Sequence, residues 1–197
     1  MLSLSACLKD EVIKAPFADE FERPELGSTY FNTGAPYQII TGKLAIKGAH
    51  NHPLWLKKML PRNARIEFNV SSNSSDGDIK VEAWGDGRSF ATSEDEGYLA
   101  TSYVFIFGGW GNSTSALCRM DEHAPNRKER SDIKVVTGRT YQWKIQRQGN
   151  KVEWTIDGKL FLSLDDPAPL EGDNHSYFGF NNWESDLSFD NLKITPL

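Results

Sequence analysis

Cysteine is scarce in this chain of 197 residues, and long hydrophobic runs and an excess of basic charge are both missing. Its two cysteines, Cys7 and Cys118, are too few for a disulfide framework or a zinc site. No stretch approaches the roughly 20 apolar residues that cross a bilayer as a helix. The 22 lysines and arginines are outnumbered by 27 aspartates and glutamates and form no basic stripe, so no nucleic-acid partner is expected.

Aromatic residues and glycine, in contrast, are plentiful. Phe, Trp and Tyr make up 12% of the chain, which also contains 16 glycines and 9 prolines. With 39% hydrophobic and 25% charged residues, the composition is that of a globular protein and excludes wholesale disorder. The length fits one domain, and aromatic residues combined with frequent turn residues favour an all-β fold.

Apolar and polar residues alternate along much of the chain, whereas helical periodicity is nearly absent. The run over 64–70 predicts a strand in which every second residue is buried. Runs over 140–145 and 151–156 flank a Gly149-Asn150 turn and predict a hairpin. Further strands are expected over 78–84, 103–107, 159–164, 176–180, 187–190 and 192–194. Many short strands separated by turn signals indicate a sandwich or jelly roll.

Three segments carry a resemblance to a known superfamily. The opening over 17–21, followed by Gly42-Lys43-Leu44, the hairpin over 141–158 and the closing strand over 189–194 resemble concanavalin A-like lectin/glucanase domains. The resemblance implies a two-sheet antiparallel jelly-roll sandwich over 17–197 with a concave face that often holds carbohydrate. Residues 1–16 are then expected to be an N-terminal tether.

A structural calcium ion is a further implication of this resemblance. In that superfamily, oxygens near the first and last strands meet, and the matching groups here are Asp19 or Glu20, the Gly42 carbonyl and Asp190. Calcium prefers such mixed carboxylate and carbonyl donors. The alternative is that Asp190 belongs to a turn and Asp19 is solvated. No cofactor is expected to be required.

The strand that contains Lys80 is the closest counterpart of the catalytic strand in family 16 glycoside hydrolases, which belong to the same superfamily. Alternation predicts that Asp78, Lys80 and Glu82 share one face and that Trp84 continues it. A lysine replaces the middle carboxylate of that motif, and an aspartate stands where the nucleophilic glutamate would be. We therefore expect no catalysis, and Glu82 with Glu122 as an acid/base pair is the enzymatic alternative.

Glycines surround Trp110 in the stretch over 107–112 and leave its indole uncovered by sequence neighbours. An exposed indole can stack on the apolar face of a sugar ring, while amide, carboxylate and guanidinium groups bond the hydroxyls. The alternative is that Trp110 caps the core at a corner of the sandwich. The candidate ligand-binding residues are Lys80, Glu82, Trp84, Trp110, Asn112, Arg119, Glu122 and His123.

Several polar segments leave two interpretations open. Glu122 and His123 could supply a general acid or base, or their loop could pair in solvent with its own basic residues. The segment over 181–184, Asn-Asn-Trp-Glu, could be a second sugar contact or the edge of the sandwich. His50 and His52 are interpreted as loop histidines because no third metal ligand can be placed near them.

The two cysteines have different expected roles. Cys118 lies in an apolar run and is expected to be a buried thiol. Leu4-Ser5-Ala6-Cys7 resembles the lipobox of bacterial lipoproteins, which implies lipidation at Cys7, export and a tether to the bacterial envelope. The expected function is therefore that of an exported, non-catalytic carbohydrate-binding domain. The alternatives are a glycoside hydrolase or lyase and a module that binds envelope proteins.

Overall fold

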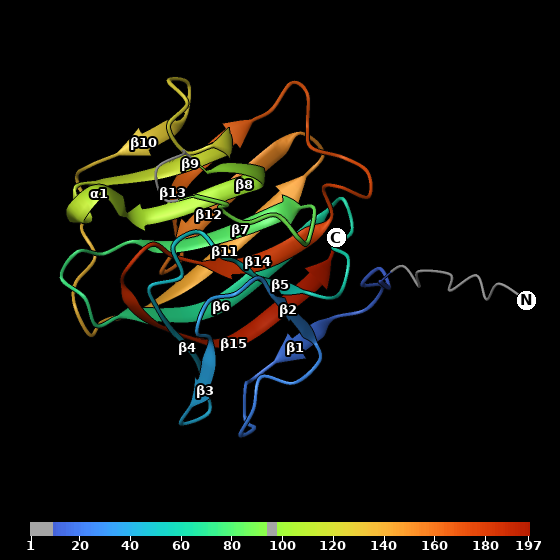
Figure 1. The fold of residues 1–197 in the computed structure, drawn as a ribbon. Coiled ribbons are helices and arrows are strands. Elements are labelled where there is room, and N and C mark those ends of the chain that lie inside the picture. The colour runs from blue at the N-terminus through green and yellow to red at the C-terminus, as the bar shows by residue number, and fades with distance from the viewer. Residues whose placement is uncertain (1–9, 94–97) are drawn as a thin grey trace, which may run out of the picture.

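Two antiparallel β-sheets pack face to face in the computed structural model, which describes residues 10–93 and 98–197 (Figure 1). The larger sheet has the order β13 (Lys159–Asp165), β12 (Lys151–Ile156), β11 (Thr140–Gln148), β6 (Ala64–Ser72), β15 (Asp186–Pro196), β4 (Lys43–Lys47) and β3 (Gln38–Ile40), with β1 (Phe17–Asp19) paired to β15. The seven-stranded sheet has the order β10 (Lys128–Arg130), β9 (Thr114–Asp121), β8 (Leu99–Gly108), β7 (Ile79–Gly85), β14 (Tyr177–Asn181), β5 (Leu54–Leu56) and β2 (Tyr30–Asn32). A short turn, α1 (Gly109–Asn112), joins β8 to β9. This is the predicted all-β, two-sheet jelly-roll sandwich.

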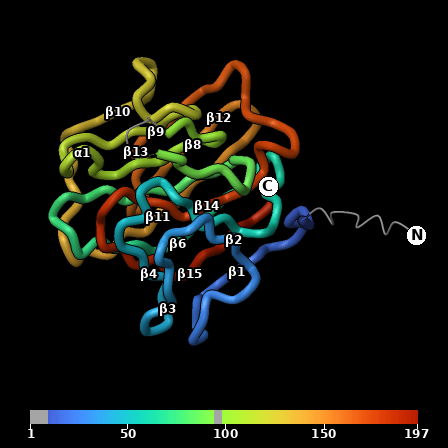
Figure 2. Tube along the Cα trace, viewed as in Figure 1, coloured from blue at the N-terminus to red at the C-terminus, as the bar shows by residue number. Residues whose placement is uncertain are grey.

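Strands that are distant in the sequence lie side by side, as the chain trace in Figure 2 shows. In the larger sheet, β6 pairs with β11 on one side and with the C-terminal strand β15 on the other. The next strand, β7, belongs to the opposite sheet and lies between β8 and β14. The chain therefore crosses between the sheets, and both inner faces contribute to one core.

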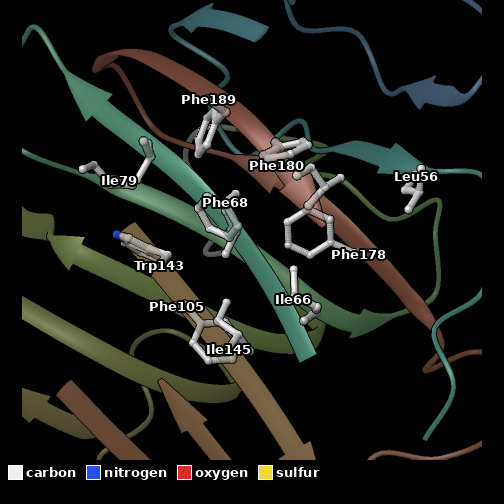
Figure 3. Close-up of a cluster of buried hydrophobic side chains, with 14 of the residues drawn as sticks. Leu56, Ile66, Phe68, Ile79, Phe105, Trp143, Ile145, Phe178, Phe180 and Phe189 are labelled. Atoms are coloured by element: carbon white, nitrogen blue, oxygen red, sulfur yellow. The ribbon is translucent and has the colours of Figure 1, made fainter. Parts of the chain in front are cut away.

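Aromatic side chains fill the space between the sheets (Figure 3). Ile66, Phe68 and Val70 are buried, as the alternation of β6 predicts. The Phe68 ring centroid lies 5.4 Å from that of Trp143 in the same sheet and 6.0 Å from that of Phe178 in the opposite sheet. Aromatic pairs at such distances stabilise a core beyond the burial of their area.

The hairpin of β11 and β12 forms as predicted. Gln148 pairs with Lys151, and Gly149 adopts a φ of 58° in the turn between them. A positive φ is readily adopted by glycine, which has no Cβ to clash. Trp143 and Trp154, on the two strands of this hairpin, are both buried in the core, with ring centroids 4.4 Å apart.

The described part of the predicted tether, from residue 10 onward, packs onto the domain. Val12 forms a parallel bridge with Met59, and Ile13 is only 6% exposed. The Ile13 N–H donates to the Met59 carbonyl at 2.9 Å. The predicted lipidation site, Cys7, lies outside the described residues. Within the described chain, no helix has the length and apolar character needed to cross a membrane.

Truncating the centre of the core should destabilise the protein far more than truncating an exposed ring. Phe68→Ala removes a side chain that is 3% exposed, and we expect the free energy of unfolding to fall by about 3–5 kcal/mol. Phe31→Ala, at a ring that is 46% exposed, is the matched control and should cost less than about 1 kcal/mol. Urea denaturation of both variants measures the difference; equal losses would contradict this description of the core.

Candidate functional site

The outward face of the seven-stranded sheet is partly covered and partly open. A second apolar cluster lies on it, formed by Ala91, Tyr98, Ala100, Val104, Ile106, Ala116 and Cys118. Cys118 is fully buried there, and burial raises the pKa of its thiol to about 12, as expected for an inert thiol. Trp55 also lies on this face, where a Cβ on Gly85 or Gly179 would come within 2.6 or 2.8 Å of its ring.

A pocket of about 760 Å³ opens beside this cluster. Its volume lies in the range of small-molecule sites. Its lining combines two tryptophans with carboxylate, amide, hydroxyl, ammonium and imidazole groups. The lining residues are Lys47, Asn51, Ser74, Asp76, Asp78, Lys80, Ala91, Ser93, Tyr98, Ile106, Gly109, Trp110, Gly111, Glu122, His123, Trp183, Glu184 and Ser185.

A left-handed turn presents Trp110 to this pocket. Trp110, Gly111 and Asn112 have φ values of 51°, 67° and 59°, a conformation that costs residues other than glycine about 1 kcal/mol each. The Asn112 amide donates to the Val135 carbonyl at 2.8 Å and accepts from the Val135 N–H at 2.9 Å, which holds the turn in place. Trp110 is 41% exposed, so it does not cap the core.

Arg127 supports the other side of this tryptophan. Its guanidinium carbon lies 4.6 Å from the centroid of the Trp110 ring, and its Nη1 donates to the Glu122 carbonyl at 2.7 Å. A cation over an indole face at this distance is attracted by the ring quadrupole. Arg127 does not line the pocket. Arg127 therefore covers one face of the Trp110 ring, and Trp110 as a whole remains 41% exposed.

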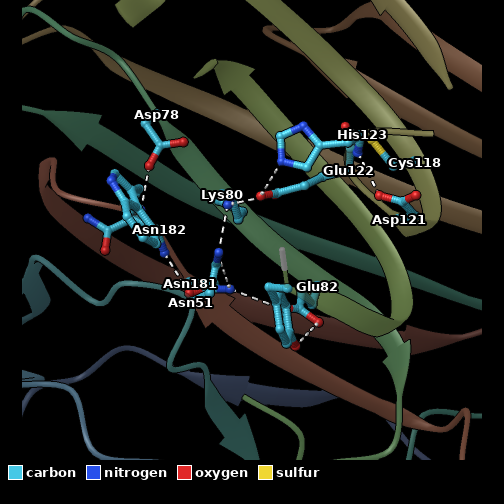
Figure 4. Close-up of polar contacts among 12 residues, drawn as sticks. Asn51, Asp78, Lys80, Glu82, Cys118, Asp121, Glu122, His123, Asn181 and Asn182 are labelled. Atoms are coloured by element: carbon cyan, nitrogen blue, oxygen red, sulfur yellow. Dashed lines mark hydrogen bonds and ion pairs between the residues drawn. The ribbon is translucent and has the colours of Figure 1, made fainter. Parts of the chain in front are cut away.

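Lys80 lies at the centre of a buried polar network (Figure 4). Its Nζ donates to Glu122 Oε2 and to Asn51 Oδ1, each at 2.8 Å. Burial alone would lower the pKa of the Lys80 ammonium, but the nearby carboxylates of Glu122 and Asp78 raise it above its ordinary value. Lys80 therefore carries its charge, and that charge is compensated inside the fold.

Asp78, the residue that precedes β7, also belongs to this network. It accepts a hydrogen bond from the Trp183 N–H, which fixes the second tryptophan of the pocket. Burial raises the pKa of the Asp78 carboxyl, and the charge of Lys80 opposes that rise. The His50 ring lies 4.7 Å from the Trp183 ring, centroid to centroid. The segment over 181–184 thus contributes Trp183 and Glu184 to the pocket.

Glu82 is enclosed rather than presented to the pocket. Its carboxylate accepts hydrogen bonds from Ser102 at 2.6 Å, from Asn181 at 2.9 Å and from Tyr98 at 3.2 Å. The residue is fully buried, and this burial raises the pKa of its carboxyl to about 7 despite the three donors and Lys80. Glu82 is not part of the pocket lining, whereas Glu122 is.

Four of the predicted binding residues lie together in the pocket lining: Lys80, Trp110, Glu122 and His123. The carboxylate of Glu122 binds Lys80, whereas Arg127 of the same loop pairs with Glu129, so the charged loop is paired within itself only in part. His123 lies beside Trp110, with ring centroids 5.9 Å apart. The Asn112 side chain stabilises the turn that contains Trp110 by bonding to Val135, and it is not part of the pocket lining. Asn51 and Lys47 are lining residues that the sequence analysis missed.

The prediction that Trp84 continues the face of Lys80 and Glu82 is wrong. Trp84 is 1% exposed and belongs to the core between the sheets. Its φ of 57° and the register shift between β7 and β14 break the alternation at the end of the strand. Such a bulge turns the side chain that follows it to the opposite face.

Arg119 is also not on the pocket face. It pairs across β8 and β9 with Tyr103, whose ring faces the core, and its Nε donates to Asp166 Oδ2 at 2.9 Å. The next residue, Met120, has a φ of 65°, and Glu122 then returns to the pocket side. Arg119 therefore stabilises the segment around Asp166 and does not contact the pocket.

The donors implied for calcium have other neighbours in this arrangement. Arg23 donates to both carboxylate oxygens of Asp19 at 2.6 and 2.9 Å, so the Asp19 carboxylate is already paired with a guanidinium group. The Oδ2 atom of Asp190 lies 3.9 Å from the Nζ atom of Lys43. Gly42 lies next to the carboxylate of Glu22. Over residues 10–93 and 98–197, no group of three His, Cys, Asp or Glu side chains could hold a metal ion.

Comparison with known proteins supports the fold. No protein-family model and no curated protein matches the sequence. Carbohydrate binding module CBM66 from Bacillus subtilis aligns with a TM-score of 0.64 at 12% identity, covering 86% of this chain and 97% of the module. Laminarinase from Flavobacterium sp. UMI-01 aligns with a TM-score of 0.61 at 12% identity, and the alignment covers 92% of this chain and 100% of the laminarinase chain. The Emp46p carbohydrate recognition domain aligns with a TM-score of 0.64 at 10% identity, and the alignment covers 90% of this chain and 94% of that domain.

At these identities the likeness establishes the fold. The chain is a two-sheet antiparallel jelly-roll sandwich, the fold that its sequence resemblance implies. This fold is shared by proteins described as carbohydrate-binding modules, carbohydrate recognition domains and glycoside hydrolases. Because one fold can host many functions, the function of this protein depends on the residues of its own site.

The raised pKa of Glu82 predicts a pH-dependent stability. A carboxyl with a pKa of about 7 when folded and 4.5 when unfolded contributes stability that is full below about pH 4.5 and is lost as the pH rises through about 7. The loss amounts to about 3 kcal/mol. Urea denaturation of the native protein and of Glu82→Gln between about pH 4 and 8 should show a difference in unfolding free energy that changes across this window. Glu184→Gln, at an exposed carboxyl, is the control, and a constant difference for Glu82→Gln would contradict the assignment.

Proposed function

We propose that this protein is a non-catalytic carbohydrate-binding domain and that the pocket between Trp110 and Trp183 is its binding site. The observation that carries the proposal is the presence of two tryptophans in the lining of one polar pocket. Indole rings pack on the apolar C–H faces of a sugar ring, and no other common side chain offers so large a flat apolar surface. Fold neighbours described as carbohydrate-binding modules and recognition domains support the same class of ligand.

The polar groups of the lining complement the hydroxyl groups of a sugar. Glu184 and His123 are exposed, and Asn51 and Asp78 lie deeper in the pocket. Carboxylates accept hydrogen bonds from hydroxyls, whereas amides both donate and accept. A pocket with a few placed polar groups and apolar walls is the ordinary form of a small-molecule site.

The surroundings of the carboxylates support a binding role over a catalytic one. Glycoside hydrolysis by the common mechanism requires two carboxyl groups that flank the scissile bond. Of the proposed pair, Glu82 is enclosed by Ser102, Asn181 and Tyr98, and Glu122 is engaged by Lys80. Release of reducing ends from a bound oligosaccharide would contradict the non-catalytic part of the proposal.

Trp110 provides the direct test. A glycan array probed with the full chain, with calcium and with chelator, should identify a sugar class, and Trp110→Ala should weaken binding to it at least tenfold. Tenfold corresponds to about 1.4 kcal/mol, comparable to one lost aromatic contact. The melting temperature should change by no more than a few degrees, because Trp110 is 41% exposed.

Phe31→Ala is the matched control, since Phe31 is a comparably exposed ring (46%) on the same sheet and outside the pocket lining. It should leave glycan binding unchanged. Unaltered binding by Trp110→Ala would contradict the assignment of the pocket. A blank array in both conditions would contradict carbohydrate binding and favour a protein partner.

We also propose that the protein is exported and carries lipid at Cys7, on the basis of the lipobox-like segment alone. A precursor with an intact signal, expressed in bacteria, should then partition with membranes, and Cys7→Ser should release it. Cys118→Ser is the control, because Cys118 is buried in the domain, and it should remain with the membranes. Membrane association of Cys7→Ser would contradict lipidation at this position.

A further inference from the structure

The charges that line the pocket are mostly negative. The acidic groups are Asp76, Asp78, Glu122 and Glu184, and the basic groups with fixed charge are Lys47 and Lys80. Four negative charges against two positive ones leave a balance of −2. A concave site with low-dielectric walls concentrates such a field on the ligand.

Lys80 contributes little positive field to a ligand. Its ammonium is 3% exposed and donates to Glu122 and Asn51, both at 2.8 Å. Asp78 lines the same pocket, and its negative charge favours the charged form of Lys80. One ammonium therefore lies among two carboxylates in the floor of the pocket, and the floor as a whole remains negative.

The nearby guanidinium is also directed away from the ligand. Arg127 lies over one face of the Trp110 ring, is not part of the lining, and donates to the Glu122 carbonyl and to the Glu129 carboxylate. Among the described lining residues, this leaves two basic side chains at the exposed rim, Lys47 and His123, and the His123 imidazole lies 3.7 Å from Glu122 Oε1. An anionic sugar would thus meet acidic groups on most sides, with one exposed lysine to compensate.

We propose that the pocket selects glycans that carry free amino groups and rejects glycans that carry carboxylate or sulfate groups. This inference rests on the proposed carbohydrate-binding function and specifies its ligand class. A protonated amine donates three hydrogen bonds, and carboxylates such as those of Asp78 and Glu184 only accept. Charge-assisted bonds of this kind are about twice as strong as neutral ones.

Three oligosaccharides of one length separate the possibilities. The full chain is titrated by calorimetry with hexamers of glucosamine, N-acetylglucosamine and galacturonic acid at about pH 5.5, where a sugar amine is protonated. We expect the amine to bind about tenfold more tightly than the N-acetylated hexamer and the galacturonate hexamer to bind most weakly. The preference for the amine should shrink at about 500 mM NaCl, because salt screens exposed charges.

Variants test the origin of the preference. Glu184→Gln removes an exposed carboxylate of the lining and should reduce the preference for the amine severalfold, with the affinity for the N-acetylated hexamer kept. Glu25→Gln is the matched control, since Glu25 is exposed and outside the pocket, and it should change neither affinity.

The outcomes distinguish the two levels of the proposal. Binding of the galacturonate hexamer as tight as that of the amine, or no gain for the amine over the N-acetylated hexamer, overturns the charge selectivity and leaves carbohydrate binding in place. Failure of all three hexamers together with a blank glycan array overturns the proposed function and this inference with it. The expected order of affinities, lost in Glu184→Gln, supports both.

Discussion

The ammonium group of Lys80 has to be compensated inside the fold, and the elements around the pocket are arranged to do so. Glu122 reaches it from the end of β9, Asn51 from the loop before β5, and Asp78 from the residue that precedes β7. Breaking such a buried pair by removing one partner typically costs 3–5 kcal/mol, because the other charge is left unpaired. The pocket floor therefore has a fixed geometry that does not depend on a ligand.

The sheets could be predicted because their signals are local. The alternation of apolar and polar residues can be seen within each of the strands β6, β7, β11 and β12 by itself. The turn between β11 and β12 is likewise indicated by Gly149, a residue of the turn. The same reasoning failed where the pleat is interrupted. The positive φ angle at Trp84 ends the alternation of β7, so Trp84 enters the core, whereas Arg119 follows the regular alternation of β9 to the face opposite Cys118 and lies away from the pocket. A shift of one residue reverses the face on which every later side chain lies.

The site could be predicted only in part, because its contacts join distant segments. Lys80 meets Asn51 across 29 positions and Glu122 across 42, and Glu82 meets Asn181 across 99. No spacing rule relates residues so far apart. Trp110 was identified because its neighbouring glycines give a local signal, whereas Lys47 has none.

The placement of Trp55 has a consequence for how this protein can vary in evolution. Its ring lies where the side chains of residues 85 and 179 would otherwise be, and its indole N–H donates to the Ser89 carbonyl. Glycine is therefore required at both positions only while a large flat ring stays at position 55. Among descendants of this sequence, these three positions should change together: a smaller residue at 55 would open space for side chains on β7 and β14, and a lone change at either glycine would be eliminated by selection.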